Sequence, residues 1–171
     1  MTDKKLKSHR VKIDKIDKEI YSLIQKRASH AVAIGKIKSK VSPKESFYKP
    51  DRETKILRNI LNANKKGLLP DSKIRAIYKE LISGCLSLEE ILKVAYLGPE
   101  ATHSEAAVHN QFGSQALRIP TSTIDDVFYQ VINDDVNLGV VPVENSSEGV
   151  INTTLNCLAD SKDINIIGEI Y

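Results

Sequence analysis

No part of this 171-residue sequence is apolar for long enough to cross a membrane, because a transmembrane helix needs about 20 consecutive apolar residues. The N-terminus, MTDKKLKSHR, leads into charged, periodic sequence and has no apolar signal core. Cysteine is also scarce: Cys85 and Cys157 lie far apart and lack the spacing of a zinc or redox site. We therefore expect a cytoplasmic protein with reduced thiols, no metal and no membrane partner.

Acidic side chains are scarce in the first part of the chain and basic ones in the last. Residues 1–66 contain 19 lysines and arginines against 7 aspartates and glutamates, whereas residues 94–171 contain 2 against 11. This asymmetry indicates two differently built units. The basic half can be a solvated helical surface, a nucleic-acid-binding face or a site for a small polyanion. Since no aromatic interleaving or DNA-reading motif accompanies the charge, we expect no nucleic-acid partner.

Residues 6–40 lack proline and contain one glycine, Gly35, which is a weak point in a helix. Their apolar side chains recur at steps of three and four residues, the pattern of an amphipathic helix. A helix of that length measures about 50 Å, which exceeds what a small domain encloses. We predict one long helix whose apolar stripe needs partner helices, including helices of a second chain.

Two shorter helices are predicted after a loop. Pro50 suits the first turn of a helix, and the acidic residues that follow it suit the positive N-terminal end. This helix is expected over 50–64, and a Pro-Asp-Ser run begins a third helix, predicted over 70–92. The three helices predict an all-α unit over residues 1–92.

From Lys93 onward, short apolar runs that end in turn residues alternate with helical patterns. This alternation predicts a partial α/β unit over residues 93–171, with a mainly parallel sheet covered by helices. The expected order is a strand at 94–97, a helix at 104–112, a strand at 117–119, a helix at 124–133, a strand at 138–143, a helix at 149–158 and a last strand at 164–171.

Two cations share one face of the predicted long helix. Arg27 and Lys38 are 11 positions apart in the sequence, which places them only about 20° apart around the axis and about 16 Å apart along it. Two long cationic side chains that lean together across this gap suit a small dianion. Arg10 points about 100° away and lies about 25 Å further along, so it can reach the same ligand only from a second chain. Ordinary surface cations are the alternative interpretation.

A pattern of spaced residues extends over 6–92. It comprises Leu6, Arg10, Ile13, Ile16, Asp17, Ile20, Leu23, Arg27, Gly35, Ile37 and Lys38, the run FYKPDRE at 47–53, and Ile82, Cys85 and Glu89. The pattern resembles the all-helical chorismate mutases. The resemblance implies an intertwined homodimer that rearranges chorismate to prephenate in phenylalanine biosynthesis without a cofactor.

The resemblance also implies a role for each site residue. Arg10 matches an arginine that the partner subunit donates, and Arg27 and Arg52 match residues that hold substrate carboxylates. Lys38 would lie beside the breaking ether oxygen, and Glu53 would accept the ring hydroxyl. The reaction needs neither a covalent intermediate nor a proton transfer, so a site with several cations and few bases suits it.

Three further substrate-binding positions depart from one version of the family pattern. Lys49 stands where aspartate is common, Cys85 where serine occurs, and Glu89 where glutamine donates a hydrogen bond to the ether oxygen. An ionised carboxylate only accepts hydrogen bonds, so Glu89 can donate only when it is protonated. We therefore expect mutase activity to rise toward acidic pH. For Cys85, the alternative role is packing within the helix.

Two motifs, YLGPEATHSEAA at 96–107 and GVVPVENSSEG at 139–149, lie at predicted strand-to-helix turns. Backbone N–H groups and hydroxyls at such turns suit a carboxylate, although capping and turn formation use the same residues. The expected substrate contacts are Thr102, Ser104, Glu144, Asn145 and Ser146.

Together the two motifs resemble the start of prephenate dehydratase, whose cleft lies between two α/β lobes in a periplasmic-binding-protein-like fold. Ala101 and His103 replace a glycine and a phenylalanine of that family, so we do not assign His103 as a general base. A mutase followed directly by this unit resembles the bifunctional P-proteins, in which the dehydratase converts prephenate to phenylpyruvate.

The dehydratase family's Thr-Arg-Phe motif and its phenylalanine-sensing domain would follow Tyr171. We therefore expect no dehydratase activity from this chain, and lower stability in residues 94–171 than in the mutase. A catalytically inactive dimer that regulates or scaffolds another shikimate-pathway enzyme is the alternative function.

Overall fold

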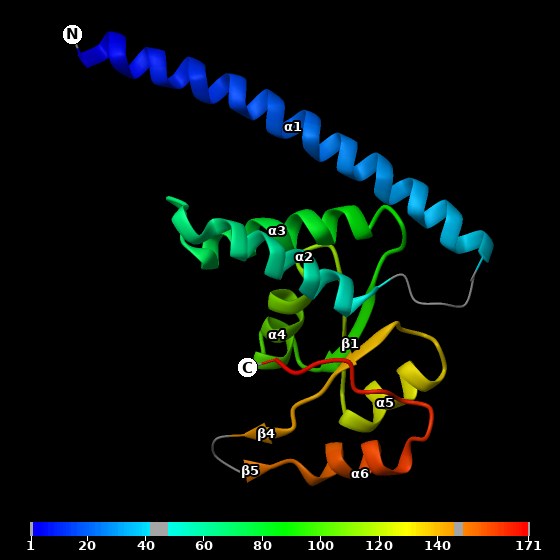
Figure 1. The fold of residues 1–171 in the computed structure, drawn as a ribbon. Helices are drawn as coiled ribbons and strands as arrows, with labels where there is room; N and C mark the ends of the chain where they lie inside the picture. The colour runs from blue at the N-terminus through cyan, green and yellow to red at the C-terminus, as the bar shows by residue number, and fades with distance from the viewer. Residues whose placement is uncertain (1, 42–47, 146–148, 171) are drawn as a thin grey trace.

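The computed structural model describes residues 2–41, 48–145 and 149–170 (Figure 1). A helical part comes first and an α/β part follows it. The helical part comprises α1 (Thr2–Val41), α2 (Pro50–Ala63), the 3₁₀ turn η1 (Asn64–Lys66) and α3 (Asp71–Leu86). The α/β part comprises β1 (Lys93–Leu97), α4 (His103–Phe112), β2 (Leu117–Thr121), α5 (Ile124–Ile132), β3 (Leu138–Val140), β4 (Glu144–Asn145), β5 (Gly149–Val150) and α6 (Asn152–Asp160).

The long helix α1 matches the predicted one closely, and its 40 residues give it a length of about 60 Å. It packs against α3 through its C-terminal half, and its N-terminal half extends away from the rest of the chain (Figure 1). Its apolar stripe is therefore exposed: Leu6, Val11, Ile13, Ile16, Ile20, Leu23, Ile34 and Ile37 are each about half accessible or more. None of the described helices combines the length and the hydrophobicity that a membrane span requires.

The two shorter helices lie side by side. Pro50 occupies the first turn of α2, which also carries Asp51 and Glu53 near the positive end of the helix. The third helix ends at Leu86, so its predicted extension to residue 92 is wrong. Leu92 is already buried in the core of the α/β part, and its carbonyl accepts the backbone N–H of Leu117. The chain must therefore leave the helix before that point, and a turn at 87–89 redirects it.

The sheet of the α/β part confirms the predicted parallel arrangement. Its three strands have the order β2-β1-β3, and β1 pairs in parallel with both neighbours. Side chains of β1 alternate between the two faces, because successive residues of a strand point in opposite directions. Val94 and Tyr96 pack with Val108 of α4, whereas Ala95 packs with Val127 of α5. The helices α4 and α5 therefore cover opposite faces of one small sheet.

For the last forty residues, one predicted helix is present but begins later than expected, and one predicted strand is wrong. The helix expected over 149–158 begins only at Asn152, because Gly149 and Val150 form the strand β5, which pairs antiparallel with β4. The strand expected over 164–171 is not formed within 164–170, the described part of that range. A strand needs a hydrogen-bonded neighbour, and no such pairing involves these residues in the part of the chain that the structure describes.

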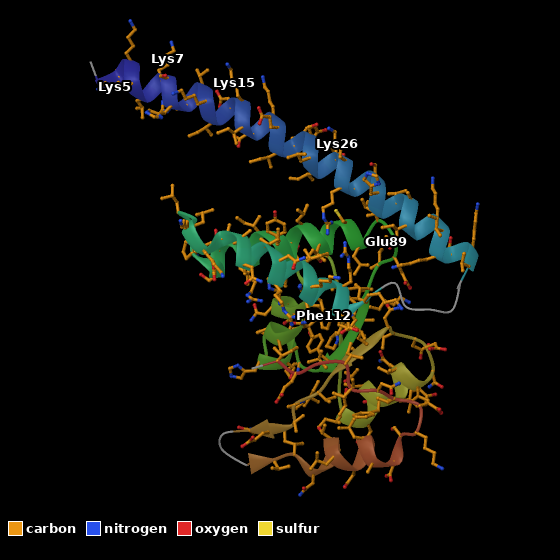
Figure 2. The ribbon with its side chains drawn as sticks, in the orientation of Figure 1. Lys5, Lys7, Lys15, Lys26, Glu89 and Phe112 are labelled. Atoms are coloured by element: carbon orange, nitrogen blue, oxygen red, sulfur yellow. The ribbon has the colours of Figure 1, made fainter. Side chains whose placement is uncertain are left out.

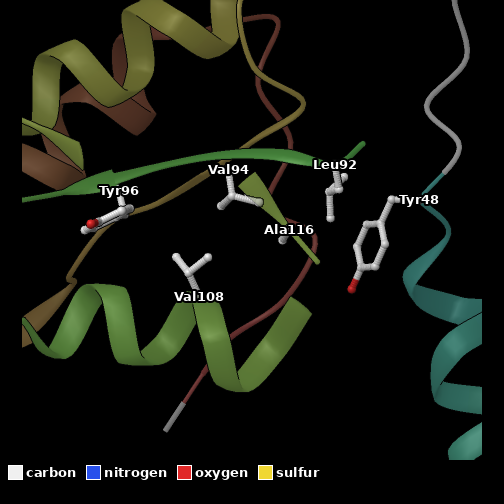
Figure 3. Close-up of a cluster of buried hydrophobic side chains, with 6 residues drawn as sticks. All are labelled: Tyr48, Leu92, Val94, Tyr96, Val108 and Ala116. Atoms are coloured by element: carbon white, nitrogen blue, oxygen red, sulfur yellow. The ribbon is translucent and has the colours of Figure 1, made fainter. Parts of the chain in front are cut away.

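One hydrophobic cluster joins the helical and α/β parts (Figure 3). It consists of Tyr48, Leu92, Val94, Tyr96, Val108 and Ala116. Tyr48 comes just before α2, and its ring meets Phe112 of α4 edge to face, with the ring centroids 5.4 Å apart. Because residues from both parts line the same cluster, the two parts bury apolar surface against each other and form a common core.

Polar contacts between α3 and the end of α4 reinforce this junction. The ammonium of Lys79 donates to the carbonyl of Asn110 at 2.6 Å, and the Glu80 carboxylate accepts from the backbone N–H and the hydroxyl of Ser114. A cation at the C-terminus of a helix is favourable because the unpaired carbonyls there carry partial negative charge. Gly113 makes the close approach possible: its φ is 78°, and an added Cβ would lie 2.6 Å from the Cβ of Ser83.

We predict that Gly113→Ala destabilises the chain by about 2–4 kcal/mol, because alanine would be strained at this backbone conformation and would collide with α3. Gly84→Ala is the matched control, since a Cβ at Gly84 of α3 would meet nothing within 4 Å. That change should stabilise the chain by about 0.5–1 kcal/mol. Urea unfolding of the three proteins measures both effects, and equal losses at the two positions would contradict the role of Gly113.

Candidate functional site

The facing surfaces of α1 and α3 bring together four of the predicted mutase residues. On α1, the guanidinium of Arg27 donates to the carbonyl of Leu81 on α3 at 3.2 Å. Nearer its C-terminus, the ammonium of Lys38 pairs with the carboxylate of Glu89 at 3.4 Å. The side chain of Glu89 is only 11% exposed and that of Lys38 31%, so the pair is partly withdrawn from water. Cys85, a free cysteine one turn before Glu89, is buried.

Glu89 lies in the turn that follows α3 and not on the helix itself. Figure 2 shows it at this turn, next to the C-terminal half of α1. Backbone hydrogen bonds to Leu86 hold the turn: its carbonyl accepts from the N–H of Glu89 at 2.8 Å and of Glu90 at 3.0 Å. The carboxylate that faces Lys38 is therefore carried by a tight turn at the junction of the two parts of the chain.

Gly35 determines how closely α1 approaches this turn. An added Cβ would lie 3.2 Å from the Cα and 3.3 Å from the Cβ of Glu89. The sequence pattern presents Gly35 as a weak point of a long helix, whereas the structure shows it as a point of close contact with the turn after α3. The buried Ala31, one turn earlier, supports the same approach. Small residues at these positions let Arg27 and Lys38 reach α3.

Three further predicted residues are exposed cations. Arg10 is exposed on the half of α1 that extends beyond α3 (Figure 1), and Arg52 is exposed in the first turn of α2. Lys49 is the exposed N-cap residue of α2. The roles of these three cations in binding substrate remain predictions.

Glu53 takes part in a different polar group. Tyr48 donates a hydrogen bond to its carboxylate, and the ammonium of Lys79 lies close enough to interact with it. Burial raises the pKa of the Glu53 carboxyl above its ordinary value, an effect that the charge of Lys79 and the Tyr48 hydrogen bond partly offset. Burial likewise lowers the pKa of Lys79, and it raises the pKa of Tyr48 to about 12, with the charge of Glu53 adding to the shift.

This group lines a cavity of about 440 Å³ between α2, α3 and α4. Its polar lining is completed by Thr54, Arg58, Asn62, Arg75 and Gln111. Sequence reasoning missed Tyr48 and Lys79, because nothing in the pattern distinguishes Lys79 from the other lysines of the helical part. The pair of aromatic residues Phe47 and Tyr48 was the one available signal for Tyr48.

The dehydratase-like motifs follow neighbouring parallel strands. Thr102 and Ser104 come after β1, at the N-terminus of α4, and the hydroxyl of Thr102 donates to the carbonyl of Pro99 at 3.0 Å. Glu144 and Asn145 come after β3 and are exposed in β4, whereas Ser146 lies outside the described residues. Since β1 and β3 are parallel, both motifs begin at the same edge of the sheet.

The turn before α4 explains one departure from the dehydratase pattern. Ala101, which stands where the family has glycine, adopts a φ of 63°. Glycine is favoured in this left-handed region because it has no Cβ to clash with the backbone. The backbone N–H of Ala101 donates to Glu105 at 2.6 Å, which helps to hold the turn. Ala101 therefore adopts a backbone conformation that glycine would adopt at lower cost.

Comparisons with known proteins assign both parts of the chain. Residues 9–90 match the family model of chorismate mutase type II, and residues 94–171 match that of prephenate dehydratase. These two matches define a helical mutase sequence followed by a dehydratase sequence. The chain thus carries both family signatures, in the order in which the bifunctional chorismate mutase/prephenate dehydratases combine them.

Several relatives carry that name. The bifunctional chorismate mutase/prephenate dehydratase of Stutzerimonas stutzeri is 44% identical over 168 residues, and that of Aquifex aeolicus is 47% identical over the same length. Each alignment covers 96% of this chain and 46% of the relative. A prephenate dehydratase of Bacillus subtilis is 35% identical over 78 residues, or 46% of this chain and 27% of the relative. The chain thus spans about half the length of the bifunctional relatives that it matches.

The burial of Glu53 predicts a pH-dependent stability. Because the folded chain binds the Glu53 proton more tightly than the unfolded chain, this group stabilises the fold most below its ordinary pKa of 4.5. That contribution is lost as the pH rises through the higher pKa of the folded state. We expect Glu53→Gln to reduce the fall in unfolding free energy between pH 4.5 and 7.

Urea unfolding at both pH values measures this effect. Asp51→Asn is the matched control, because Asp51 is exposed in the same turn of α2. The control should keep the fall that the wild type shows. If Glu53→Gln and the wild type had the same pH dependence, the carboxylate would not be the source of the effect.

Proposed function

We propose that this protein is a chorismate mutase that converts chorismate to prephenate in phenylalanine biosynthesis, with its mutase unit ending at residue 92. The observation that carries the proposal is the convergence of Arg27 and Lys38 from α1 with Glu89 from the turn after α3, including the 3.4 Å Lys38–Glu89 contact. Two cations on α1 therefore lie at its interface with α3, and the carboxylate of Glu89, on the turn that follows α3, faces one of them. The match to the chorismate mutase family model supports the same conclusion.

The chemistry suits such a group. The rearrangement breaks an ether bond and forms a carbon–carbon bond within one molecule, so catalysis consists of holding the reactive conformation and stabilising charge on the ether oxygen. We assign Arg27 and Arg52 to the two carboxylates of chorismate, Lys38 to the ether oxygen and Glu53 to the ring hydroxyl. Lys49 and Cys85 would border the same ligand. For Glu53, this role requires its carboxylate to leave Tyr48 and Lys79.

We further propose that the mutase works as a homodimer. The exposed apolar stripe of α1 has the length and spacing of a helix-pairing surface, and burying it would remove a large apolar area from water. Pairing of two such helices would also bring Arg10 of one chain toward the Arg27–Lys38 face of the other. The functional unit would then contain two sites, each completed by the partner chain.

The dehydratase part is assigned to the conversion of prephenate to phenylpyruvate within a periplasmic-binding-protein-like fold. Thr102, Ser104, Glu144, Asn145 and Ser146 would contact its substrate. In that family the cleft lies between two lobes, and the described α/β residues form one three-stranded sheet and one hairpin. We therefore expect no phenylpyruvate from these 171 residues alone. A cytoplasmic location and the absence of a nucleic-acid partner remain predictions.

The first test is chorismate turnover by the purified protein, with phenylpyruvate assayed in parallel. We predict that Arg27→Ala lowers kcat/KM by at least about tenfold, because a charge-assisted hydrogen bond contributes about 1.5–3 kcal/mol. Lys26→Ala is the matched control, since Lys26 is exposed on an adjacent face of α1 and is expected to leave the rate unchanged. A folded dimer without turnover would favour the regulatory or scaffolding alternative.

A pH profile tests the part played by Glu89. Because a carboxyl group donates a hydrogen bond only when protonated, kcat should rise as the pH falls from 8 toward 5. Glu89→Gln carries an amide that donates at every pH, so its profile should be flat. A wild-type rate that is constant over this range would show that Glu89 does not act as a donor.

The dimer is tested by a charge in the apolar stripe of α1. Ile16 is 52% exposed in the single chain, and Ile16→Asp should convert a dimer of twice 19.0 kDa to a monomer. Lys15→Asp, at an adjacent exposed position (Figure 2), should stay dimeric. Light scattering after size-exclusion chromatography measures both masses. A wild-type monomer with full mutase activity would refute the shared site.

A further inference from the structure

The segment 87–92 carries Glu89 from α3 to the first strand of the α/β part. On its α3 side, the turn is held by the two hydrogen bonds to the Leu86 carbonyl and by the Ser87 hydroxyl, which donates to the carbonyl of Gly84 at 2.9 Å. Only three residues separate Glu89 from the beginning of β1 at Lys93. The position of Glu89 therefore depends on how both ends of this short segment are fixed.

Asn137, just before β3, fixes the other end. Its side-chain oxygen accepts from the backbone N–H of Lys93 at 2.8 Å, and its own backbone N–H donates to the carbonyl of Lys93 at 3.0 Å. Its side-chain nitrogen donates to the carboxylate of Glu90 at 3.3 Å. One half-buried amide thus binds both the backbone at the beginning of β1 and the residue next to Glu89.

We propose that Asn137, a residue of the α/β part, is a positioning residue for the mutase site, because it holds the segment that presents Glu89 to Lys38. The expected effect of Asn137 on catalysis rests on the proposed mutase function. It links the two parts of the chain in a specific way: a residue of the dehydratase sequence sets the geometry of a group in the mutase sequence.

The geometry around Glu89 leaves little room for displacement. Gly35 approaches so closely that an added Cβ would lie 3.2 Å from the Cα of Glu89, so the turn has little room to move toward α1. Movement in the other direction lengthens the Lys38–Glu89 contact, which is already 3.4 Å. Charge-assisted contacts of this kind weaken with small increases in distance. A shift of the segment by a fraction of an ångström would therefore change the site.

The two bonds require an amide, because its oxygen accepts from the backbone of Lys93 and its nitrogen donates to Glu90. In Asn137→Asp, a carboxylate can still accept from the backbone of Lys93, but it would repel the carboxylate of Glu90. Adding Glu90→Gln restores the bond with reversed polarity, since the new amide donates to the new carboxylate. Glu90→Gln alone keeps the original bond, because its side-chain oxygen can accept from Asn137.

The experiment compares these variants in the full chain. We expect Asn137→Asp to lower kcat on the order of tenfold with little change in KM, the kind of loss that a slightly misplaced catalytic group causes. The double variant with Glu90→Gln should recover to within about threefold of the wild type. Asn133→Asp, the same change at an exposed position of the same loop, is the matched control and should leave kcat unchanged.

Amide hydrogen exchange at Glu89 and Glu90 gives a second reading that does not need turnover. Exchange should become faster in Asn137→Asp and return toward the wild-type rate in the double variant. Should Asn137→Asp fail to fold, Asn137→Ala, which removes the side-chain bonds without adding repulsion, replaces it, with a smaller loss of kcat expected.

Three results would overturn the inference: unchanged kcat, a loss that Glu90→Gln does not rescue, or a loss with unchanged exchange at Glu89. A wild-type protein without mutase turnover would instead refute the proposed function. In that case the exchange data would still show whether Asn137 holds the segment: unchanged exchange would overturn that claim, and faster, rescuable exchange would support it.

Discussion

The packing of α3 between α1 and α4 is the constraint on which the rest of the structure depends. One side of α3 receives α1, through the close approach at Gly35 and the bond from Arg27 to Leu81. Another side receives the end of α4, through Lys79, Glu80 and the close approach at Gly113. Both approaches use a glycine, because an added Cβ would crowd the facing residue. The mutase cluster and the dehydratase-like sheet are thereby attached to the same helix.

In this arrangement, the apolar surface of the α/β part is better covered than that of the helical part. The α/β part shares a buried cluster with Tyr48 and Leu92, so its sheet is stabilised from the helical side as well as by α4 and α5. Among the residues that the structure describes, none covers the N-terminal half of α1 in this way, although its apolar residues are spaced for packing. An exposed stripe of this length is costly in water, and association of two copies is the simplest arrangement that removes it.

For Glu53, the packing of the chain adds contacts that the sequence motif does not predict. In the sequence it is one member of a run that resembles a mutase site, directly after Arg52. In the structure it faces Tyr48 and Lys79, and burial rather than a neighbouring charge dominates its pKa. A carboxylate held in that way is both a structural contact and a candidate ligand group. Which role prevails depends on the energy of replacing Tyr48 and Lys79 by a substrate hydroxyl.

Much of the fold follows from the sequence because its signals are local. The spacing of apolar residues in 6–40, Pro50 at a helix start and the alternation after Lys93 correctly predict α1, α2 and the parallel sheet. The face shared by Arg27 and Lys38 also follows from helical geometry alone. The end of α3 and the missing strand at 164–170 could not be predicted in this way, since they depend on where Leu92 is buried and on whether a partner strand is adjacent.

The sequence by itself therefore determined the helix faces, the order of the helices and strands from α1 to β3, and the resemblance to known families. Only the tertiary structure decided that Glu89 lies on a turn against Gly35, that Glu53 turns toward Lys79, and that Asn137 binds the segment beside Glu89. The physical reason is the range of the interactions. Periodicity and capping act between residues a few positions apart, whereas these contacts join residues about 25 to 55 positions apart, and their geometry exists only once α1, α3 and the sheet have packed together.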